Sequence, residues 1–241
     1  MNNFKFAILL VFASLSIFMI GCKKDATTYT CTTCKTTPDA LAANDNSSKG
    51  IYKGIVIGSS GTIMFDVMNS GSTITATLVI DGVTTTLTSN VVWSGNSAYV
   101  GNFTGTMNGS PVSIKLSLNI DGSNPMITSS DIPGHPNATF DIIKETSQNL
   151  VECFEGTYET DKPESGVFNL LLSRTAKIFG GRSRKTGSTE TNGFSGIITA
   201  TNEFKDNKSG TIFGTLSGDV ISGSFKDSDN RNVTITANRK W

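Results

Sequence analysis

The nine residues VSIKLSLNI at 112–120 decide the fold, because apolar and polar side chains alternate along them one for one. The apolar positions are Val112, Ile114, Leu116, Leu118 and Ile120. In an extended chain these side chains would all point to one side and the polar ones to the other. The stretch therefore predicts a β-strand with one buried face and one solvated face.

The same alternation recurs along the chain beyond residue 50, where no window has a convincing helical stripe. Further alternating runs begin at Ile63, Ile74, Phe168, Ile221 and Val233. The run from Ile74 ends at Asp81-Gly82, which is a strong signal for a tight β-hairpin. Glycine is abundant, at 24 residues, as expected for many short strands joined by turns. The sequence predicts an all-β, antiparallel protein.

Three pairs of matching segments indicate that the β-rich part is a tandem repeat. The pairs are 52–54 with 154–156, 105–109 with 214–218, and 137–140 with 232–235, at offsets of 102, 109 and 95 residues. We therefore expect two β-meander domains, 50–147 and 152–241, each with room for about six to eight strands. Such meanders hide their apolar faces as small barrels or sandwiches, and both alternatives stay open.

The N-terminus predicts secretion. Lys5 precedes an apolar run over 6–20, and the small residue Gly21 comes directly before Cys22. A basic start, a short apolar run and a small residue make a secretory signal peptide, here 1–21. Phe18-Met19-Ile20-Gly21-Cys22 resembles the lipobox of bacterial lipoproteins. This resemblance implies that Cys22 is acylated, becomes the first mature residue and attaches the protein to a membrane.

The segment 22–49 has hardly any large apolar residue, so we expect a flexible tether. Pro38 in a first turn and Asn44 as a closing residue predict a short helix near 38–44 within it. The cluster Lys23-Lys24-Asp25 resembles the export tags of Bacteroidota surface lipoproteins. That resemblance covers about the first 25 residues and implies an outer-membrane lipoprotein displayed on the cell surface.

Charge excludes one class of partner. The mature chain would have 241 − 21 = 220 residues, with 19 basic and 20 acidic side chains once Lys5 is removed. A formal net charge of −1 gives no overall attraction to the phosphates of nucleic acid. We expect no nucleic-acid partner.

With Cys22 acylated, Cys31, Cys34 and Cys153 remain, so at most one internal disulfide forms, within the near pair or to Cys153. A thioredoxin-type dithiol would need a helix start, and a zinc site would need four ligands. His135 is the one histidine and lies in a turn-rich stretch. We expect no metal, no cofactor and no catalytic residue.

Two groups of residues are candidate ligand contacts. Arg182, Arg184 and Lys185 belong to a basic run that could hold an acidic group, although the spacing favours pairing with the acidic run 152–164 across strands. Trp93 and Tyr99 could form an aromatic platform for sugar rings, although aromatic side chains in strands are usually core.

The function that these features favour is a non-catalytic binding module for a glycan or a small amphiphilic ligand, with a barrel mouth or a sheet face as the site. The alternative is a protein–protein interaction or structural component of the outer membrane. An unrecognised hydrolase is the third hypothesis.

Overall fold

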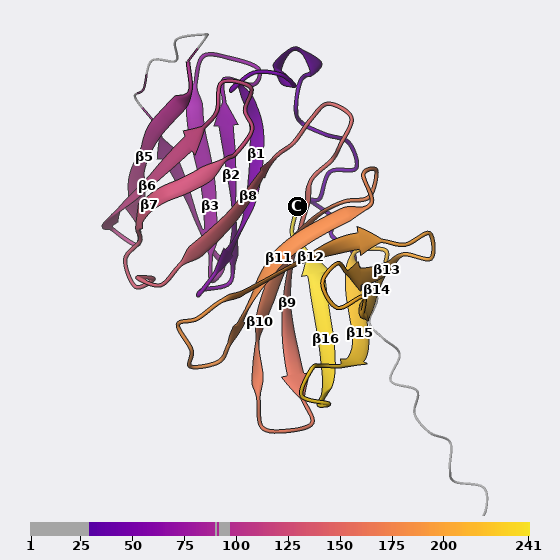
Figure 1. Cartoon of the computed structure of the whole chain (residues 1–241). Helices are drawn as coiled ribbons and strands as arrows, with labels where there is room; N and C mark the ends of the chain where they lie inside the picture. Colours follow the sequence, from indigo (N-terminus) through magenta and orange to yellow (C-terminus); the bar gives the residue numbers. More distant parts are fainter. Residues whose placement is uncertain (1–28, 90, 92–96) are drawn as a thin grey trace, which may run out of the picture.

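The computed structural model describes residues 29–89, 91 and 97–241. Two antiparallel sheets of eight strands follow each other along the chain, and they form the two lobes visible in Figure 1. The prediction of two tandem antiparallel β-meander domains is confirmed. The signal peptide and Cys22 lie outside the described residues. No helix in the described part of the chain is long and apolar enough to cross a membrane.

The first sheet runs in the order β7-β6-β5-β4-β3-β2-β1-β8. Its strands are β1 (Gly50–Ile57), β2 (Gly61–Val67), β3 (Ile74–Ile80), β4 (Val83–Thr88), β5 (Tyr99–Met107), β6 (Ser110–Leu118), β7 (Met126–Asp131) and β8 (Thr139–Lys144). The last strand returns to pair with the first, so the sheet is barrel-like. It stays open between its two edge strands, β7 and β8.

The second sheet is a closed barrel in which β9 pairs with both β10 and β16. Its strands are β9 (Glu152–Thr160), β10 (Ser165–Ser173), β11 (Ile178–Lys185), β12 (Asn192–Ile198), β13 (Glu203–Asp206), β14 (Ile212–Ser217), β15 (Val220–Lys226) and β16 (Asn232–Arg239). Full closure leaves this sheet without an exposed edge.

The two sheets share a topology, and the sequence matches are consistent with it at both ends. Tyr52 and Phe154 lie in the first strand of each sheet, and the segments 137–140 and 232–235 enter the eighth. The middle match differs by one strand, because 105–109 closes the fifth strand of its sheet whereas 214–218 closes the sixth.

The first sheet fails to close because β7 is a poor partner strand. Its sequence MITSSD has no apolar alternation, and most of its residues are exposed. The connection to β8 contains Pro133 and Pro136, which have no N–H to donate to a ladder. The corresponding connection in the second barrel, 227–231, is a shorter turn without proline.

Most of the alternating stretch 112–120 lies in β6, and its last apolar residue differs from the prediction. Val112, Ile114, Leu116 and Leu118 are all buried, as expected from their alternation. Ile120 is 51% exposed, because the strand ends at Leu118 and the chain turns where Asn119 N–H donates to the Ser123 carbonyl. The prediction that Ile120 belongs to the buried face is wrong.

Strand β1 joins the two sheets. All eight of its residues are buried, as in a strand covered on both faces. Tyr52 and Val56 point into the first sheet, whereas Ile55 packs on Val151, Cys153 and Leu171 of the second lobe. The C-terminus lies between the two lobes (Figure 1), and Trp241 packs against the same cluster.

A buried ion pair lies at this junction. Lys53 Nζ of β1 is 2.6 Å from Glu145 Oε2, and both side chains are at most 3% exposed. The Glu145 carboxylate also accepts the backbone N–H groups of Asp39, at 2.7 Å, and Val151, at 3.0 Å. One carboxylate therefore connects the N-terminal segment, the first sheet and the chain that enters the second barrel.

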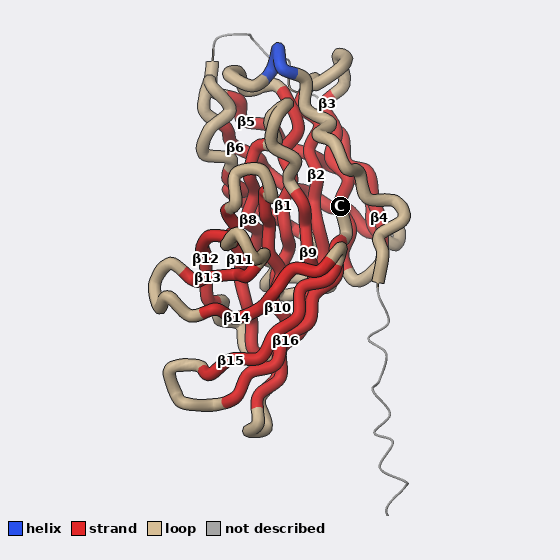
Figure 2. The backbone as a smooth tube through the Cα atoms, turned by 90° about the vertical axis from the view of Figure 1, so that its right-hand side faces the viewer, coloured by secondary structure: helices blue, strands red, loops and turns tan. Residues whose placement is uncertain are grey.

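The segment 29–49 is bound to the rest of the protein, so the prediction of a flexible tether is wrong for these residues. The Tyr29 hydroxyl donates to the Arg239 carbonyl of the second barrel at 2.7 Å. At the other end, Leu41 N–H donates to Asn69 Oδ1 at 3.0 Å, and Asn69 Nδ2 donates to the Asp39 carbonyl at 2.8 Å. Figure 2 shows this loop running along the molecule from the short helix to the second barrel.

The helix predicted near 38–44 is also shorter than expected. It is a single 3₁₀ turn over Ala42–Asn44, and no side chain caps it. Asn44 turns inward instead and donates through Nδ2 to the Asn69 carbonyl at 2.8 Å. The segment is held by these tertiary hydrogen bonds, because three helical residues have little stability of their own.

Breaking the buried ion pair should destabilise the whole protein. Lys53→Met leaves Glu145 charged and buried without its cation, and we expect a loss of about 3–5 kcal/mol in the free energy of unfolding. Urea unfolding followed by intrinsic fluorescence measures this loss.

The matched control is Lys115→Met on the exposed face of β6, which should cost less than about 0.5 kcal/mol. The double variant Lys53→Met/Glu145→Gln should recover part of the loss, because its buried amide is neutral. Equal effects of Lys53→Met and Lys115→Met would contradict this account of the junction.

Candidate ligand-binding cavity

One end of the second barrel is filled by ion pairs. Glu152 and Arg239 follow the alternation of the buried Phe154 and Ala237, so they lie on the inner side of the wall. Glu152 Oε1 is 2.7 Å from Arg239 Nη1, and its other oxygen is 2.6 Å from Arg174 Nε. This network plugs the end of the barrel to which Tyr29 is bound.

The middle of the barrel is aromatic. Seven consecutive strands, β9 to β15, each contribute one phenylalanine to the interior: Phe154, Phe168, Phe179, Phe194, Phe204, Phe213 and Phe225. Rings on neighbouring strands touch, with centroids 5.6 Å apart for Phe204 and Phe213, and the rings of Phe179 and Phe204, two strands apart, have centroids 5.0 Å apart. Aromatic pairs at such distances stabilise the fold by more than the apolar area that they bury accounts for.

A β-bulge turns Phe213 inward. Phe204 pairs with Gly214 and Lys205 pairs with Ile212, so Phe213 has no opposite residue. Ile212 is consequently displaced to the outside, where it is 46% exposed. The Phe213 ring contacts four other phenylalanine rings, those of Phe179, Phe194, Phe204 and Phe225. Bulges commonly redirect a side chain in this way.

Two inward-facing glycines make room for the rings. A Cβ on Gly181 would lie 2.8 Å from Phe194 Cζ, and a Cβ on Gly196 would lie 2.6 Å from Phe179 Cζ. Contacts this short are not tolerated, so both positions require glycine as long as the rings keep their places. Small residues opposite large ones let a narrow barrel hold a ring of aromatic side chains.

At the end opposite the ion pairs the interior is hollow. The cavity has a volume of about 710 Å³, and its walls include Tyr158, Phe194, Phe213 and Phe225. The turns 161–164, 207–211 and 227–231 form its mouth. A volume in this range suits a small organic ligand, and phenylalanine walls favour an apolar one.

The charges at the mouth neutralise one another. Arg231 is 2.7 Å from both Glu164 and Asp227, and Lys185 lies 3.0 Å from the same Glu164 carboxylate. The hydrogen bond from Lys185 and those from Arg231 lower the pKa of Glu164. Uncharged polar groups complete the rim, namely Ser183, Asn192 and Thr211. These ion pairs therefore add no net charge of their own, and the uncharged groups offer hydrogen bonds beside Lys208, which also lines the cavity.

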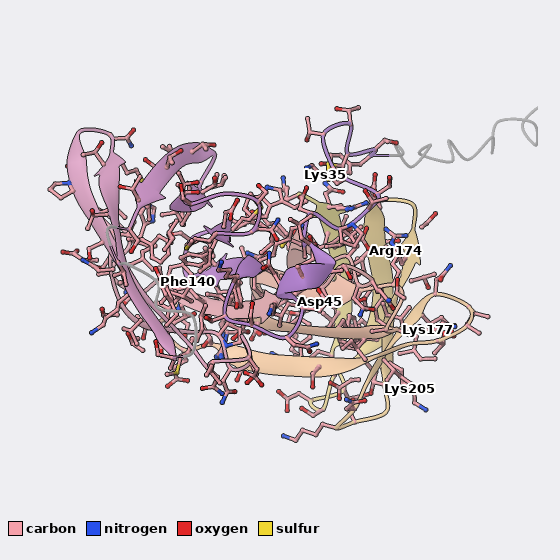
Figure 3. All side chains as sticks on the ribbon, turned by 90° about the horizontal axis from the view of Figure 1, so that it is seen from above. Lys35, Asp45, Phe140, Arg174, Lys177 and Lys205 are labelled. Carbon is pink, nitrogen blue, oxygen red and sulfur yellow. A yellow bond between two sulfur atoms is a disulfide. The ribbon has the colours of Figure 1, made fainter. Side chains whose placement is uncertain are left out.

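A second hollow lies between the two lobes. This interdomain cleft has a volume of about 790 Å³ and opens where β7 and β8 separate. Its far wall is the outer face of β10 to β12, and the ion pair between Asp141 and Arg182, at 2.8 Å, crosses it. In Figure 3, Phe140 of this cleft lies on the side of the first sheet, whereas Arg174 and Lys177 lie on the second barrel.

The predicted basic contacts turn out to be held within the protein. Arg182 pairs with Asp141 and Lys185 with Glu164, so opposite charges meet across strands and lobes. Arg184 is only 7% exposed and donates to the Asn137 carbonyl at 2.7 Å. Its Nε has no hydrogen-bond partner among the described residues, and burial lowers the pKa of its guanidinium. These cations therefore do not form an exposed charged strip.

The predicted aromatic contacts are not brought together at a described surface. Tyr99 is 2% exposed inside the first sheet, where its hydroxyl donates to Ser89 Oγ at 3.2 Å and its ring packs on Phe103. Tyr99 is a core residue and not part of a sugar-binding platform. Trp93 lies outside the described residues.

The structure shows which two cysteines form the disulfide and which one is free. Cys31 and Cys34 form a disulfide in the bound N-terminal segment, next to the hydrogen bond from Cys31 N–H to Asp219. Cys153 is a free thiol that is buried between the lobes, 3.8 Å from the Gly54 carbonyl. Burial raises the pKa of this thiol to about 12.

His135 has a hydroxyl neighbour, but the arrangement is not that of a catalytic triad. Its Nδ1 is hydrogen-bonded to Ser59 Oγ, and Asp81 Oδ2 lies 3.9 Å from the same nitrogen. A serine hydrolase needs the hydroxyl and the carboxylate on different ring nitrogens. None of the three side chains lines the cavity or the cleft. In the described part of the chain no three histidine, cysteine or carboxylate side chains could jointly hold a metal ion.

Sequence reasoning missed the phenylalanine cluster. Half of the 14 phenylalanines lie in 152–241, spaced by 9 to 15 residues from 154 to 225. Regular aromatic spacing of this length indicates one ring per strand, and it could have located the interior of the second barrel. The first half has three in 50–147, and its interior is filled mainly by branched aliphatic side chains.

Comparison with known proteins identifies no relative: no protein-family model, no curated protein and no solved structure matches the chain.

Cys153 should be unreactive in the folded protein. A thiol with a pKa of about 12 is almost entirely protonated at pH 8, and the thiolate is the nucleophile. Iodoacetamide at pH 8 should leave the peptide that contains Cys153 unmodified in native protein and modify it fully in urea. Peptide mapping by mass spectrometry measures both states, and rapid labelling of the native protein would show that the thiol is not buried.

Proposed function

We propose that this protein is a lipid-anchored envelope protein that binds a small amphiphilic ligand inside its second barrel. The observation that carries the proposal is the cavity of about 710 Å³, with phenylalanine walls and a polar rim. An apolar group would replace water against Phe194, Phe213 and Phe225, and a polar group would remain at the mouth. Burial of apolar surface of this kind contributes about 25 cal/mol per Å².

The chemistry of the walls favours an amphiphile over a glycan. A sugar placed between phenylalanine rings would leave many hydroxyl groups without hydrogen-bond partners, which costs about 1–3 kcal/mol for each group. The hydroxyl and amide groups at the rim, from Ser183, Asn192 and Thr211, can satisfy a single polar head. The aromatic surface expected at Tyr99 is buried and gives no support to a sugar platform.

A lipid attached to Cys22 would keep the second barrel near the membrane. Tyr29 is hydrogen-bonded to the plugged end of the barrel, and seven residue steps separate it from Cys22. Seven steps span at most about 25 Å when fully extended. The proposal places the protein in the outer membrane, on the residues that resemble a lipobox and a surface-export tag.

Contact with another envelope protein is a second candidate function. Its support is a row of side chains on the outside of the second barrel, in which Ile178 pairs with Ile197 and Lys205 pairs with Ile212. The three isoleucines are 45–53% exposed. Exposed apolar side chains in neighbouring positions are typical of interaction surfaces. The basic residues first expected there are engaged within the chain.

Filling the cavity should abolish ligand binding. Ser183 points into the cavity from β11, and Ser183→Trp would place an indole where the ligand lies. We expect this variant to bind the uncharged fluorescent probe N-phenyl-1-naphthylamine about tenfold more weakly or worse. A tenfold loss of affinity corresponds to roughly 1.4 kcal/mol of binding free energy. Fluorescence titration measures the affinity, and circular dichroism checks that the variant folds.

Ser222→Trp is the matched control, because Ser222 is exposed on the outside of the same barrel. It should bind the probe as the unchanged protein does. The proposal fails if the unchanged protein does not bind the probe, or if the two tryptophan variants bind it equally well.

Anchoring can be tested separately. Cys22→Ala removes the sulfur that would carry the lipid, so the variant should incorporate no labelled palmitate and should leave the detergent phase of a phase-partition assay. Retention of the label and of membrane attachment in this variant would sink the lipoprotein interpretation.

A further inference from the structure

The cavity of the second barrel and the interdomain cleft meet at one place. Phe194, Asp206 and Lys208 line both hollows. They come from β12, from the end of β13 and from the turn that follows it. The two hollows therefore adjoin along these residues, which form a shared rim, and we refer to the hollows as the two arms of one candidate site.

Beside these residues the strand pairing in the barrel wall is short. Strand β12 has seven residues and β13 has four, and they pair only over Gly196–Ile198. One further hydrogen bond, from Asn207 N–H to the Ser195 carbonyl, continues the contact toward the mouth. Asn192 and Gly193 have no opposite residue in β13, and a Cβ on Gly193 would have no atom within 4 Å.

The cleft is apolar beside this short pairing. Phe140 and Ile142 of β8 face it from the first lobe, and Leu171 of β10 faces it from the second. Met126 of β7, which is 57% exposed, lies on the far side of the opening. The space exists because β7 and β8 do not pair, so the incomplete closure of the first sheet creates this second arm.

The rim between the arms carries a cation. The Asp206 carboxylate is engaged by its own turn, accepting the Ser209 hydroxyl at 2.8 Å and Lys208 N–H at 3.0 Å. The Lys208 side chain is exposed; burial alone would raise the pKa of Asp206, but hydrogen bonds from Ser209 together with the charge of Lys208 outweigh burial and lower that pKa. A negatively charged group could therefore approach Lys208 while apolar groups extend into both arms.

We propose that the ligand is an amphiphile with two apolar branches and an anionic head, the chemistry of a diacyl phospholipid. One branch lies in the phenylalanine-lined cavity, the other in the interdomain cleft, and the head group lies at Lys208. This inference rests on the proposed function, because it specifies the ligand of the same cavity. Two branches fit better than one long chain, because both arms start from the same rim.

The test compares a two-chain with a one-chain lipid. Isothermal titration calorimetry, below the micelle concentration of each lipid, uses dioctanoyl phosphatidylglycerol and its mono-octanoyl lyso form. Each fully buried methylene strengthens binding roughly fourfold, so we expect the second chain to improve affinity by about a hundredfold or more.

Two variants separate the arms. Ser195 lines only the cleft and Ser183 only the cavity. Ser195→Trp should remove most of the two-chain advantage and leave the one-chain affinity within about twofold, whereas Ser183→Trp should weaken both lipids. Lys208→Gln should weaken phosphatidylglycerol by roughly fivefold and leave dioctanoyl phosphatidylcholine unchanged.

The outcomes distinguish this inference from the proposed function. If neither lipid nor the uncharged probe binds, the proposed function fails and this inference fails with it. If both lipids bind and Ser195→Trp affects them equally, the cavity remains the site and the two-branched ligand is overturned. A loss confined to the two-chain lipid in Ser195→Trp supports the assignment.

Discussion

The structure depends on strand β1 being buried on both faces. One face completes the apolar interior of the first sheet through Tyr52 and Val56, and the other supplies Ile55 to the junction with the second barrel. A strand in this position leaves its polar groups no access to water, so each must be paired. Lys53 is paired with Glu145, and the Val56 carbonyl accepts the Asn169 side chain at 2.7 Å. The relative position of the two lobes follows from these few buried bonds.

Two sheets of one topology have acquired different interiors. Branched aliphatic side chains fill the first, whereas one phenylalanine from each of seven successive strands fills the middle of the second, and four of the seven also line its hollow end. An eight-stranded barrel is just wide enough either to be filled by side chains or to hold one small ligand. The bulge at Phe213 and the glycines at 181 and 196 bring these rings into place.

Two irregularities of strand pairing lie next to each other. The missing pairing between β7 and β8 opens the cleft, and the short pairing between β12 and β13 lies beside it. The first sheet is therefore open at its edge strands, whereas the second barrel stays closed with a short β12–β13 ladder. At Phe194 and Lys208 the cavity and the cleft share lining residues, so the two hollows adjoin there.

The sequence by itself determined the strands, because alternation at 112–118 and at similar runs depends only on neighbouring residues. It also indicated the two tandem halves, through segments such as 52–54 and 154–156. Only the tertiary structure decided that 29–49 is bound, because its hydrogen bonds to Asn69, Glu145 and Arg239 join residues distant in the chain. The cavity too was beyond sequence reasoning, since a hollow exists only once β9 and β16 meet and fix the size of the barrel. Local pattern specifies which face of a strand is apolar, whereas closure and long-range pairing specify what that face encloses.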